Sequence, residues 1–342
     1  MNSASLPKRI GLQMDASTDK KQGLICSYLL DGKGSGEAYT WAQIEDYSPQ
    51  KNSGLLWINI NFANLNAQHW IREKSGLSDF VVNALLSKAK ARPYSITLDE
   101  GTLVILRGVN LKPGAQPDDL VSIRIWIEEN RIITSQQSHV LSINDLQSEI
   151  EHHHGPRTQG DFLVRICTHI TERIADTVDE MGDIIDRFED TILTQKTINA
   201  SLANLRRQII NLRRYLAPDR EAMSRLETAT LNWLSVDNKE ELKQASNRII
   251  RHIEDLDAIR DRAAITQEEI TNTLMVQSNS RMYLLSVVAV IFLPLSFITG
   301  LLGTNVGGIP GNASHWAFPA LSIFLFSIAL LELWYFKKHK WF

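Results

Sequence analysis

Two long apolar runs near the C-terminal end limit what this chain can fold into. The first, residues 283–302, reads YLLSVVAVIFLPLSFITGLL and carries no charged side chain. The second, residues 315–336, reads HWAFPALSIFLFSIALLELWYF and carries one carboxylate, Glu332. A helix of about 20 apolar residues crosses the hydrocarbon core of a bilayer. We therefore predict two transmembrane helices rather than two buried core helices, which is the other structure that such runs form.

Features within and beside the runs fit this prediction. Trp316 stands at one end of the second run and Trp334 and Tyr335 at the other, where aromatic rings prefer the membrane interface. Pro294 lies inside the first run. Membrane helices tolerate proline when neighbouring groups satisfy the freed carbonyl, so Pro294 predicts a kink and not a break.

The charges that flank the runs predict their orientation. Lys337, Lys338 and Lys340 follow the second run, whereas the connecting residues 303–314 contain no Lys or Arg. Lysine-rich flanks stay in the cytoplasm. Two spans then place the N-terminal side there too, and its first residues lack the apolar core of a signal peptide. We expect residues 1–282 and the basic tail to be cytoplasmic.

The composition and the motifs argue against two other classes of function. The net charge of −3 argues against a nucleic-acid partner. The sequence contains no nucleotide-binding loop, no G-x-S-x-G, no H-E-x-x-H and no paired C-x-x-C, so we expect no enzyme. Cys26 and Cys167 are far apart in the sequence, which suits a reducing compartment.

The first half of the chain alternates strand and helix patterns. Segments 65–76 and 78–90 have helical spacing. Runs of branched and aromatic residues predict strands and begin at Leu24, Gly54, Thr102, Val121 and Arg131. These patterns predict an α/β domain over residues 1–155, with a hinge at Gly155.

Beyond residue 155 the pattern is entirely helical. One apolar stripe predicts an amphipathic helix or an antiparallel coiled coil, and it contains Phe162, Ile166, Ile170, Ile174, Val178, Met181, Ile184 or Ile185, and Phe188. A second helix is expected from about Ala200, broken near Pro218. A third begins near Lys239 and meets no Pro or Gly before Pro294, so we expect it to continue into the first span. At about 1.5 Å per residue, such a helix is on the order of 100 Å long.

Two membrane helices per chain cannot enclose a water-filled path, so several chains must share one. Steps of three or four residues place one set of side chains on a single face of the first span, with Thr299 beside them: Asn279, Met282, Leu285, Ala289, Leu293, Ser296 and Gly300. Rings of Met and Leu would form a hydrophobic constriction that gates by dewetting. The alternative is that these residues make ordinary contacts between membrane helices.

The segment after the first span decides between these readings. Gly303, Thr304 and Asn305 follow FLPLSFITG, and this arrangement resembles the Gly-x-Asn signature of the CorA family of two-span divalent-cation transporters. The resemblance extends to the whole layout. It implies a funnel-shaped homopentamer in a membrane, with an α/β cytoplasmic domain and a long helical stalk that continues into the first span. A tethered coiled-coil scaffold would leave this segment without a purpose.

The resemblance also implies where the parts of the transporter lie. The first spans surround a central pore, the pore positions fall on the face described above, and five Asn305 amides bind a hydrated cation at the outer entrance. The expected parts are the α/β domain (1–155), stalk (156–282), first span (283–303), periplasmic loop (304–315), second span (316–336) and basic tail (337–342).

The loop favours zinc over magnesium. The magnesium branch usually has Met where this chain has Thr304, an aromatic residue where it has Leu302, and an acidic loop where it has VGGIPGNASHW. Residues 307–311, GGIPG, instead look like the loop of ZntB-type zinc transporters of the bacterial inner membrane. That likeness implies zinc uptake coupled to protons, with no prosthetic group. The alternatives are zinc export and a CorA-type magnesium or cobalt channel, and nickel and cadmium are further cargo candidates.

Side chains of the types that zinc prefers as ligands occur elsewhere in the sequence, but each has an explanation that does not involve a metal ion. His315 at the outer mouth is a candidate for capturing zinc or a proton, or for anchoring at the interface. The cluster at residues 152–154 and the pair Cys167 and His169 are weaker candidates, because helix positions two apart point in different directions. Stalk carboxylates form a solvated face or concentrate cations near the inner mouth: Glu254, Asp255, Asp257, Asp261, Glu268 and Glu269.

Overall fold

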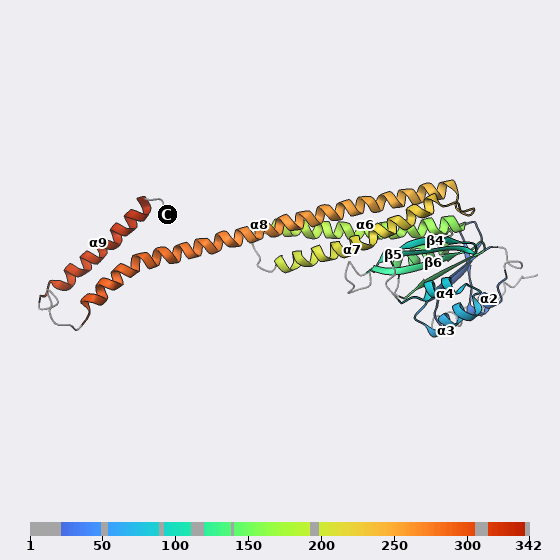
Figure 1. Ribbon diagram of the computed structural model, residues 1–342, viewed down its shortest axis with the longest axis horizontal. Helices are drawn as coiled ribbons and strands as arrows, with labels where there is room; N and C mark the ends of the chain where they lie inside the picture. Colours follow the sequence, from blue (N-terminus) through green and yellow to red (C-terminus); the bar gives the residue numbers. More distant parts are fainter. Residues whose placement is uncertain are drawn as a thin grey trace, which may run out of the picture. The chain divides into compact units, whose positions relative to one another are not determined.

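The computed structural model describes residues 22–48, 54–88, 92–110, 120–137, 140–191, 198–304 and 314–338. Figure 1 shows the chain coloured along its sequence. It divides into two compact units, residues 1–266 and 267–342, which are treated separately below.

One mixed sheet forms the centre of the first unit. Its strands, within the described residues, are β1 (Leu24–Leu30), β2 (Gly36–Ala38), β3 (Leu55–Asn61), β4 (Tyr94–Leu98), β5 (Gly101–Val109), β6 (Leu120–Ile127) and β7 (Arg131–Gln136). The strand order is β2-β1-β3-β7-β6-β5-β4, and only the β3–β7 pairing is parallel among these strands. The five predicted strands are therefore confirmed, whereas β2 and β4 were not predicted.

Helices cover both faces of this sheet, which explains why the interior strand β3 is apolar at successive positions. On one face of β3, Leu56 and Ile58 belong to a buried cluster with residues of the neighbouring short helices. On the other face, the Trp57 ring meets the Phe162 ring at 5.2 Å between centroids. A strand covered on both faces has no need of polar residues at alternate positions.

Short helices cover the first face (Figure 1). They are α2 (Trp41–Glu45), α3 (Leu65–His69), the π-helical turn η1 (Trp70–Lys74) and α4 (Asp79–Leu86). The two predicted helices at 65–76 and 78–90 are confirmed where the structure describes them, although the first changes from α to π geometry at Trp70. Helix α5 (Leu141–Glu151) was not predicted. Gly155 packs closely against Ile150, and its role as a hinge stays a prediction.

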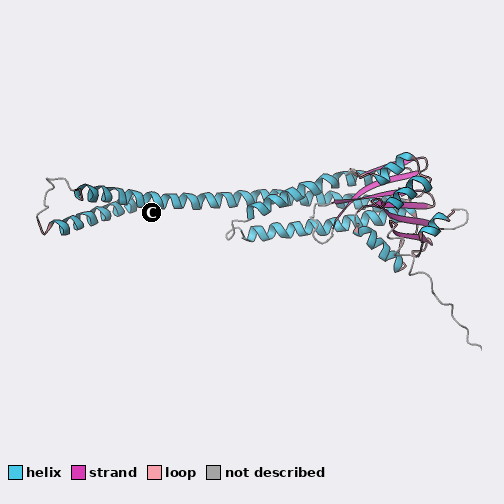
Figure 2. Ribbon diagram, turned by 90° about the horizontal axis from the view of Figure 1, so that it is seen from below, coloured by secondary structure: helices cyan, strands magenta, loops and turns pink. Residues whose placement is uncertain are grey.

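Two long helices, α6 (Gln159–Thr191) and α7 (Ile198–Thr228), cover the other face, as Figures 1 and 2 show. The part of α8 (Val236–Leu302) that belongs to the first unit lies against these two helices, to which Asp257 and Arg262 form ion pairs. The predicted apolar stripe of α6 is buried from Phe162 to Ile185, with Ile185 rather than Ile184 in it, whereas its last member, Phe188, is half-buried. Apart from Ser246, the buried residues of α8 in the first unit recur at intervals of three, four or seven residues, as in a coiled coil: Leu242, Ala245, Ile249, Leu256, Ile259, Ala263 and Thr266.

The expected break near Pro218 was wrong, because α7 continues through this residue to Thr228. The next residue explains how the helix is held there. Asp219 is fully buried, and its Oδ1 accepts the backbone N–H of Arg107 on β5 at 3.0 Å. The β4–β5 pairing ends at Tyr94 and Ile105, so the Asp219 carboxyl replaces a strand carbonyl at Arg107. This tertiary contact offsets the helix hydrogen bond that proline removes.

Asp219 is expected to make the stability of the chain depend on pH. Burial raises the pKa of its carboxyl well above 3.8, against the opposing effects of the Arg107 N–H and guanidinium. The folded chain therefore keeps a proton that the unfolded chain releases. The stabilisation is complete below the unfolded pKa and is lost as pH rises through the folded pKa, by up to about 1.4 kcal/mol per pH unit.

The variant Asp219→Asn keeps the acceptor oxygen but cannot titrate. Its melting temperature, followed by tryptophan fluorescence of the purified full chain, should rise relative to the wild type as pH increases from about 5 to about 8. A difference between the two proteins that stays constant over this range would contradict the proposed titration of Asp219.

The second unit contains the remainder of α8 and helix α9 (Ala317–Lys338). Both α8 and α9 are long and apolar enough to cross a membrane, and their apolar windows are almost wholly exposed in the single chain. A buried core helix would instead be covered by the protein. Helix α8 continues through Pro294 to Leu302, and the kink stays a prediction.

Candidate functional site

Within the second unit, α8 and α9 each have one face that is less exposed than the rest. On α8, Val287 is buried, and Ile291, Leu295 and Ile298 are half-buried at helical spacing. On α9 the residues of lower exposure are Ala317, Leu321, Leu325, Ile328, Ala329, Glu332 and Phe336. Because α8 and α9 are the helices of this unit within the described residues, we infer that these are the faces that they turn toward each other. We call the contact between them the hairpin seam.

The predicted pore residues lie on the opposite side of α8. Ser296 is nine residues beyond Val287 and thus about 180° around the helix from it. Leu285 and Leu293 are 76% and 71% exposed. The full predicted set is exposed in the single chain: Asn279, Met282, Leu285, Ala289, Leu293, Ser296, Thr299 and Gly300. This face, which we call the open face, is not used by α9 and is available to water or to other copies.

Hydrogen bonds cap the C-terminal end of α8 just before Asn305, the predicted ion entrance. The Gly303 N–H donates to the Thr299 carbonyl at 2.8 Å, and the Thr304 hydroxyl donates to the Leu301 carbonyl at 2.8 Å. These bonds satisfy carbonyls that a helix end otherwise leaves free. Asn305 lies outside the described residues, and His315 is exposed before α9 begins.

The other zinc-ligand candidates do not come together. Burial raises the pKa of the Cys167 thiol, which keeps it neutral and a poor metal ligand. His169 lies instead beside Glu149, at 3.1 Å, and Glu172, at 3.4 Å. The exposed His153 ring contacts the Ser35 hydroxyl at 2.8 Å. Among the residues that the structure describes, no three His, Cys, Asp or Glu side chains are placed to hold a metal ion.

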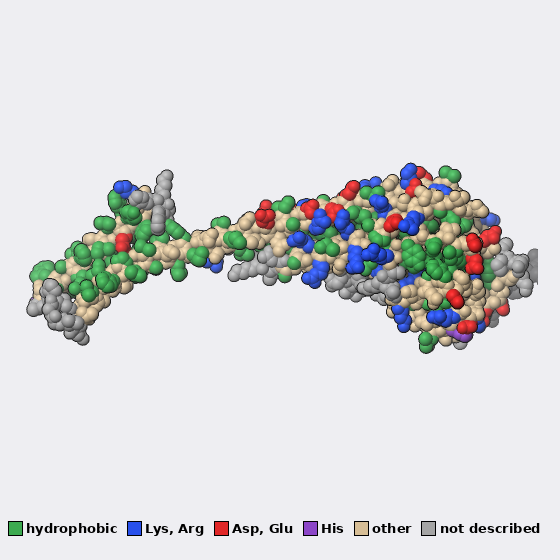
Figure 3. All heavy atoms as spheres, in the orientation of Figure 1, with side chains coloured by type: hydrophobic (Ala, Val, Ile, Leu, Met, Phe, Trp, Pro, Cys, Tyr) green, Lys and Arg blue, Asp and Glu red, His purple; other side chains and the backbone are tan. Residues whose placement is uncertain are grey.

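Two of the six predicted stalk carboxylates are paired with arginines. Asp257 lies 3.1 Å from both Arg213 and Arg260, and Asp261 lies 2.9 Å from Arg260. The other four predicted carboxylates are exposed: Glu254, Asp255, Glu268 and Glu269. Figure 3 shows both signs of charge along the helices of the first unit, whereas apolar side chains dominate the described surface of the second. This mixture supports a solvated face rather than a dedicated cation store.

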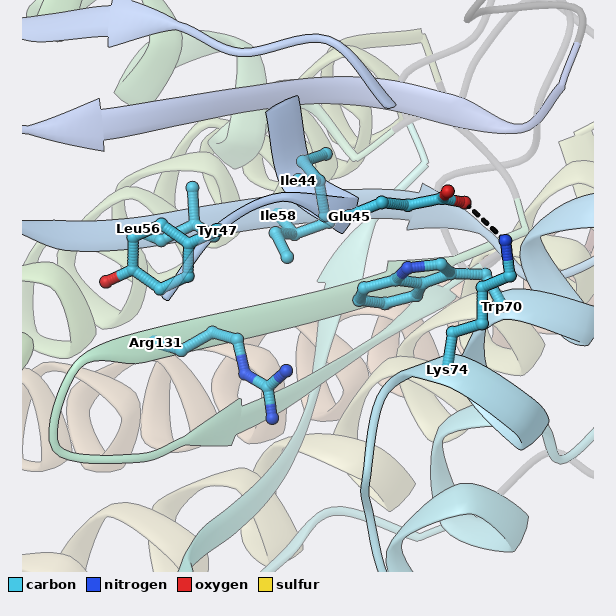
Figure 4. Close-up of a pocket in the computed structure, with 8 residues that line it drawn as sticks. All are labelled: Ile44, Glu45, Tyr47, Leu56, Ile58, Trp70, Lys74 and Arg131. Atoms are coloured by element: carbon cyan, nitrogen blue, oxygen red, sulfur yellow. Dashed lines mark hydrogen bonds and ion pairs between the residues drawn. The ribbon is translucent and has the colours of Figure 1, made fainter. Parts of the chain in front are cut away.

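A cavity of about 400 Å³ lies between α2, β3, η1 and β7 (Figure 4). Its Lys74 ammonium contacts Glu45 at 2.7 Å, and its Arg131 guanidinium contacts the neighbouring Glu128 at 2.9 Å. A metal cation would therefore meet two positively charged side chains there. This cavity is not a candidate metal site.

Comparison with known sequences finds similarity over nearly the whole chain. The model of the family described as "CorA-like Mg2+ transporter protein" matches residues 52–338. The divalent cation transporter CmaX of Pseudomonas aeruginosa is 34% identical over 327 residues, which cover 94% of this chain and 97% of CmaX. The zinc transport protein ZntB of Yersinia enterocolitica is 33% identical over 321 residues, covering 93% and 95% of the two chains.

Solved structures share the fold. The structure of full-length CmaX matches with a TM-score of 0.80 and 34% identity over 94% of this chain and 98% of that one. The CorA magnesium transporter of Methanocaldococcus jannaschii matches with a TM-score of 0.78 over 93% and 99% of the two chains. Its identity is 17%, so this second likeness concerns the fold alone.

Proposed function

This chain belongs to the CorA family of divalent cation transporters, and from that premise we propose that its cargo is zinc, taken up together with protons. It is a membrane transporter and not an enzyme. To the family assignment, the proposal adds the transported ion, its coupling to protons, the number of chains in the assembly and the residues that line the ion path.

The open face of α8 carries the proposal. Its residues are apolar or weakly polar and exposed, although they belong to a helix long enough to cross a membrane. Because α9 covers the opposite side, neighbouring copies of the chain are free to bring their open faces together. We propose a homopentamer in which these faces surround one central path. Met282, Leu285 and Leu293 would narrow it with apolar rings, and Asn279 and Ser296 would provide polar steps.

The outer entrance is proposed to be a ring of Asn305 side chains. Gly303 and Thr304 end the helix immediately before it. Five carboxamide oxygens can hold a dication through its water shell without stripping tightly bound water. His315 is proposed to lie at the same mouth, where its imidazole would help to capture zinc or a proton.

The choice of zinc rests on the loop after the first span. Residues 303–314 contain no acidic side chain, and they include GGIPG. Several relatives at 31–33% identity are named zinc transport proteins. CmaX, at 34% identity, is named a divalent cation transporter. The description of the matching family names Mg2+, so a magnesium or cobalt channel is the second candidate.

The placement in the cell is also part of the proposal. Lys337 and Lys338 end α9, which favours a cytoplasmic location for that end and, with two spans, for the first unit. We propose the bacterial inner membrane, with spans at 283–303 and 316–336, a periplasmic loop at 304–315, and cytoplasmic parts at 1–155, 156–282 and 337–342.

Ion flux into liposomes tests this function. Purified full-length protein is reconstituted with a zinc-sensitive dye inside, and uptake is followed with and without an imposed pH gradient. Zinc uptake that accelerates when protons can enter with zinc is the expected result. Matched arms with magnesium and cobalt identify the alternative cargo. Uptake of those two ions without zinc uptake would overturn the assignment of zinc.

A further inference from the structure

Glu332 is the one charged side chain in the two apolar segments 283–302 and 317–336. An ionisable group within a membrane span is costly, and such groups usually take part in the movement of ions or protons. Glu332 lies six residues before the end of α9. The predicted ion path makes no use of it, because that path is lined by α8.

Glu332 lies on the less exposed face of α9. Glu332 belongs to the hairpin seam, four residues before the buried Phe336. Its Oε2 atom is shielded from solvent and accepts no hydrogen bond from the described residues. A buried carboxylate oxygen with no donor is unfavourable. A proton or a cationic partner would relieve this cost.

The charged and titratable side chains in the described parts of α8 and α9 near the apolar segments lie toward the helix ends. On α8 they are Arg281 and Tyr283. On α9 they are Tyr335, Lys337 and Lys338, and the Lys338 ammonium lies over the Trp334 ring at 4.8 Å. None of the ion pairs among the described residues includes Glu332. The described residues of the seam therefore supply the carboxyl with no cation at ion-pair distance.

The position of Glu332 favours a proton over a metal ion as its ligand. The seam and the open face lie on opposite sides of α8, so a zinc ion in the central path does not reach this carboxyl. One carboxyl group is also too few ligands for zinc, which takes four in protein sites. A proton needs only one oxygen and brief contact with water when the seam loosens.

We propose that Glu332 is a proton-binding site that couples proton movement to the packing of α8 against α9. The carboxylate accepts one proton to become the neutral acid while the seam is closed, and it returns that proton to water when the seam opens. This inference rests on the proposed proton-coupled function. It adds the residue at which the coupling takes place.

The first experiment requires no transport. Dicyclohexylcarbodiimide reacts with protonated carboxyl groups in apolar surroundings, and the modified peptide is identified by mass spectrometry. In liposomes containing the full chain, we expect Glu332 to be labelled and the labelling to fall as pH rises. The exposed stalk residue Glu268 serves as the internal control and should stay unlabelled. Absence of label at Glu332, or labelling that does not change with pH, would overturn the proposal.

The second experiment measures coupling. In Glu332→Gln, zinc uptake should persist without a pH gradient, but the acceleration by an imposed gradient should fall to a ratio of one. Glu332→Asp, which keeps a carboxyl group, should restore part of the acceleration, and Glu268→Gln should leave it unchanged. An undiminished gradient response in Glu332→Gln would overturn the proposal. If the wild type moves no zinc, the proposed function fails, whereas the labelling result still decides whether Glu332 binds a proton.

Discussion

Replacing Asn305 by alanine should reduce zinc uptake into liposomes at least about ten-fold. In the proposed pentamer this single change removes five carboxamides from the entrance. Each hydrogen bond contributes about 0.5–1.5 kcal/mol, and about 1.4 kcal/mol corresponds to a factor of ten in binding. Partial loss of the ring's contacts to the water shell of the ion is therefore enough for the expected effect.

The matched control for this variant is Asn312→Ala. Asn312 lies in the same connecting segment, seven residues further on, and has no assigned role. It should retain wild-type uptake. Both variants must elute as the same assembly as the wild type, so that a loss of uptake reports on the entrance rather than on assembly. Wild-type uptake by an intact Asn305→Ala assembly would remove Asn305 from the ion path.

Water-soluble thiol reagents should distinguish the two faces of α8 by a factor of about ten or more in rate. Ser296→Cys changes one atom on the open face, at a polar step of the proposed path. Val287→Cys lies in the hairpin seam, where the native side chain is 4% exposed. Since reaction requires a thiolate in contact with water, Ser296→Cys should react quickly and Val287→Cys slowly.

The native cysteines set the background for this comparison. Cys26 is half-buried and is replaced by serine in all variants. Cys167 can stay, because it is completely buried and its thiol is held in the neutral form. Faster reaction at Val287→Cys than at Ser296→Cys would mean that the open face packs against protein or lipid and that the path runs elsewhere.

The pattern of neighbouring residues was sufficient to predict those helices and strands whose formation depends mainly on neighbouring residues. The five predicted strands have branched and aromatic runs, and the two spans have the required length without charge. Strand β2 has three residues, too few to form a pattern, and β4 is half exposed. The continuity of α7 at Pro218 depends on the contact between Asp219 and Arg107, residues 112 positions apart. Such a contact is invisible to a reading of neighbouring residues.

For the candidate site, too, the sequence was sufficient for some features and not for others. The family assignment from Gly-x-Asn and its surroundings is confirmed by the match over residues 52–338. Helical spacing was enough to group the residues of the open face. It could not tell which side of α8 is covered by α9, because that depends on how the second helix packs. For the same reason the sequence alone placed Glu332 only within a span, whereas the structure places it on the less exposed face of α9 with its Oε2 atom shielded from solvent.

The number of chains in one assembly tests the central claim most directly. A path lined by one helix per chain exists only where several copies surround it. Native mass spectrometry of the full-length protein released from lipid nanodiscs should give five times the chain mass of 38.7 kDa. A stable species of one or two chains that still carries zinc would contradict the account.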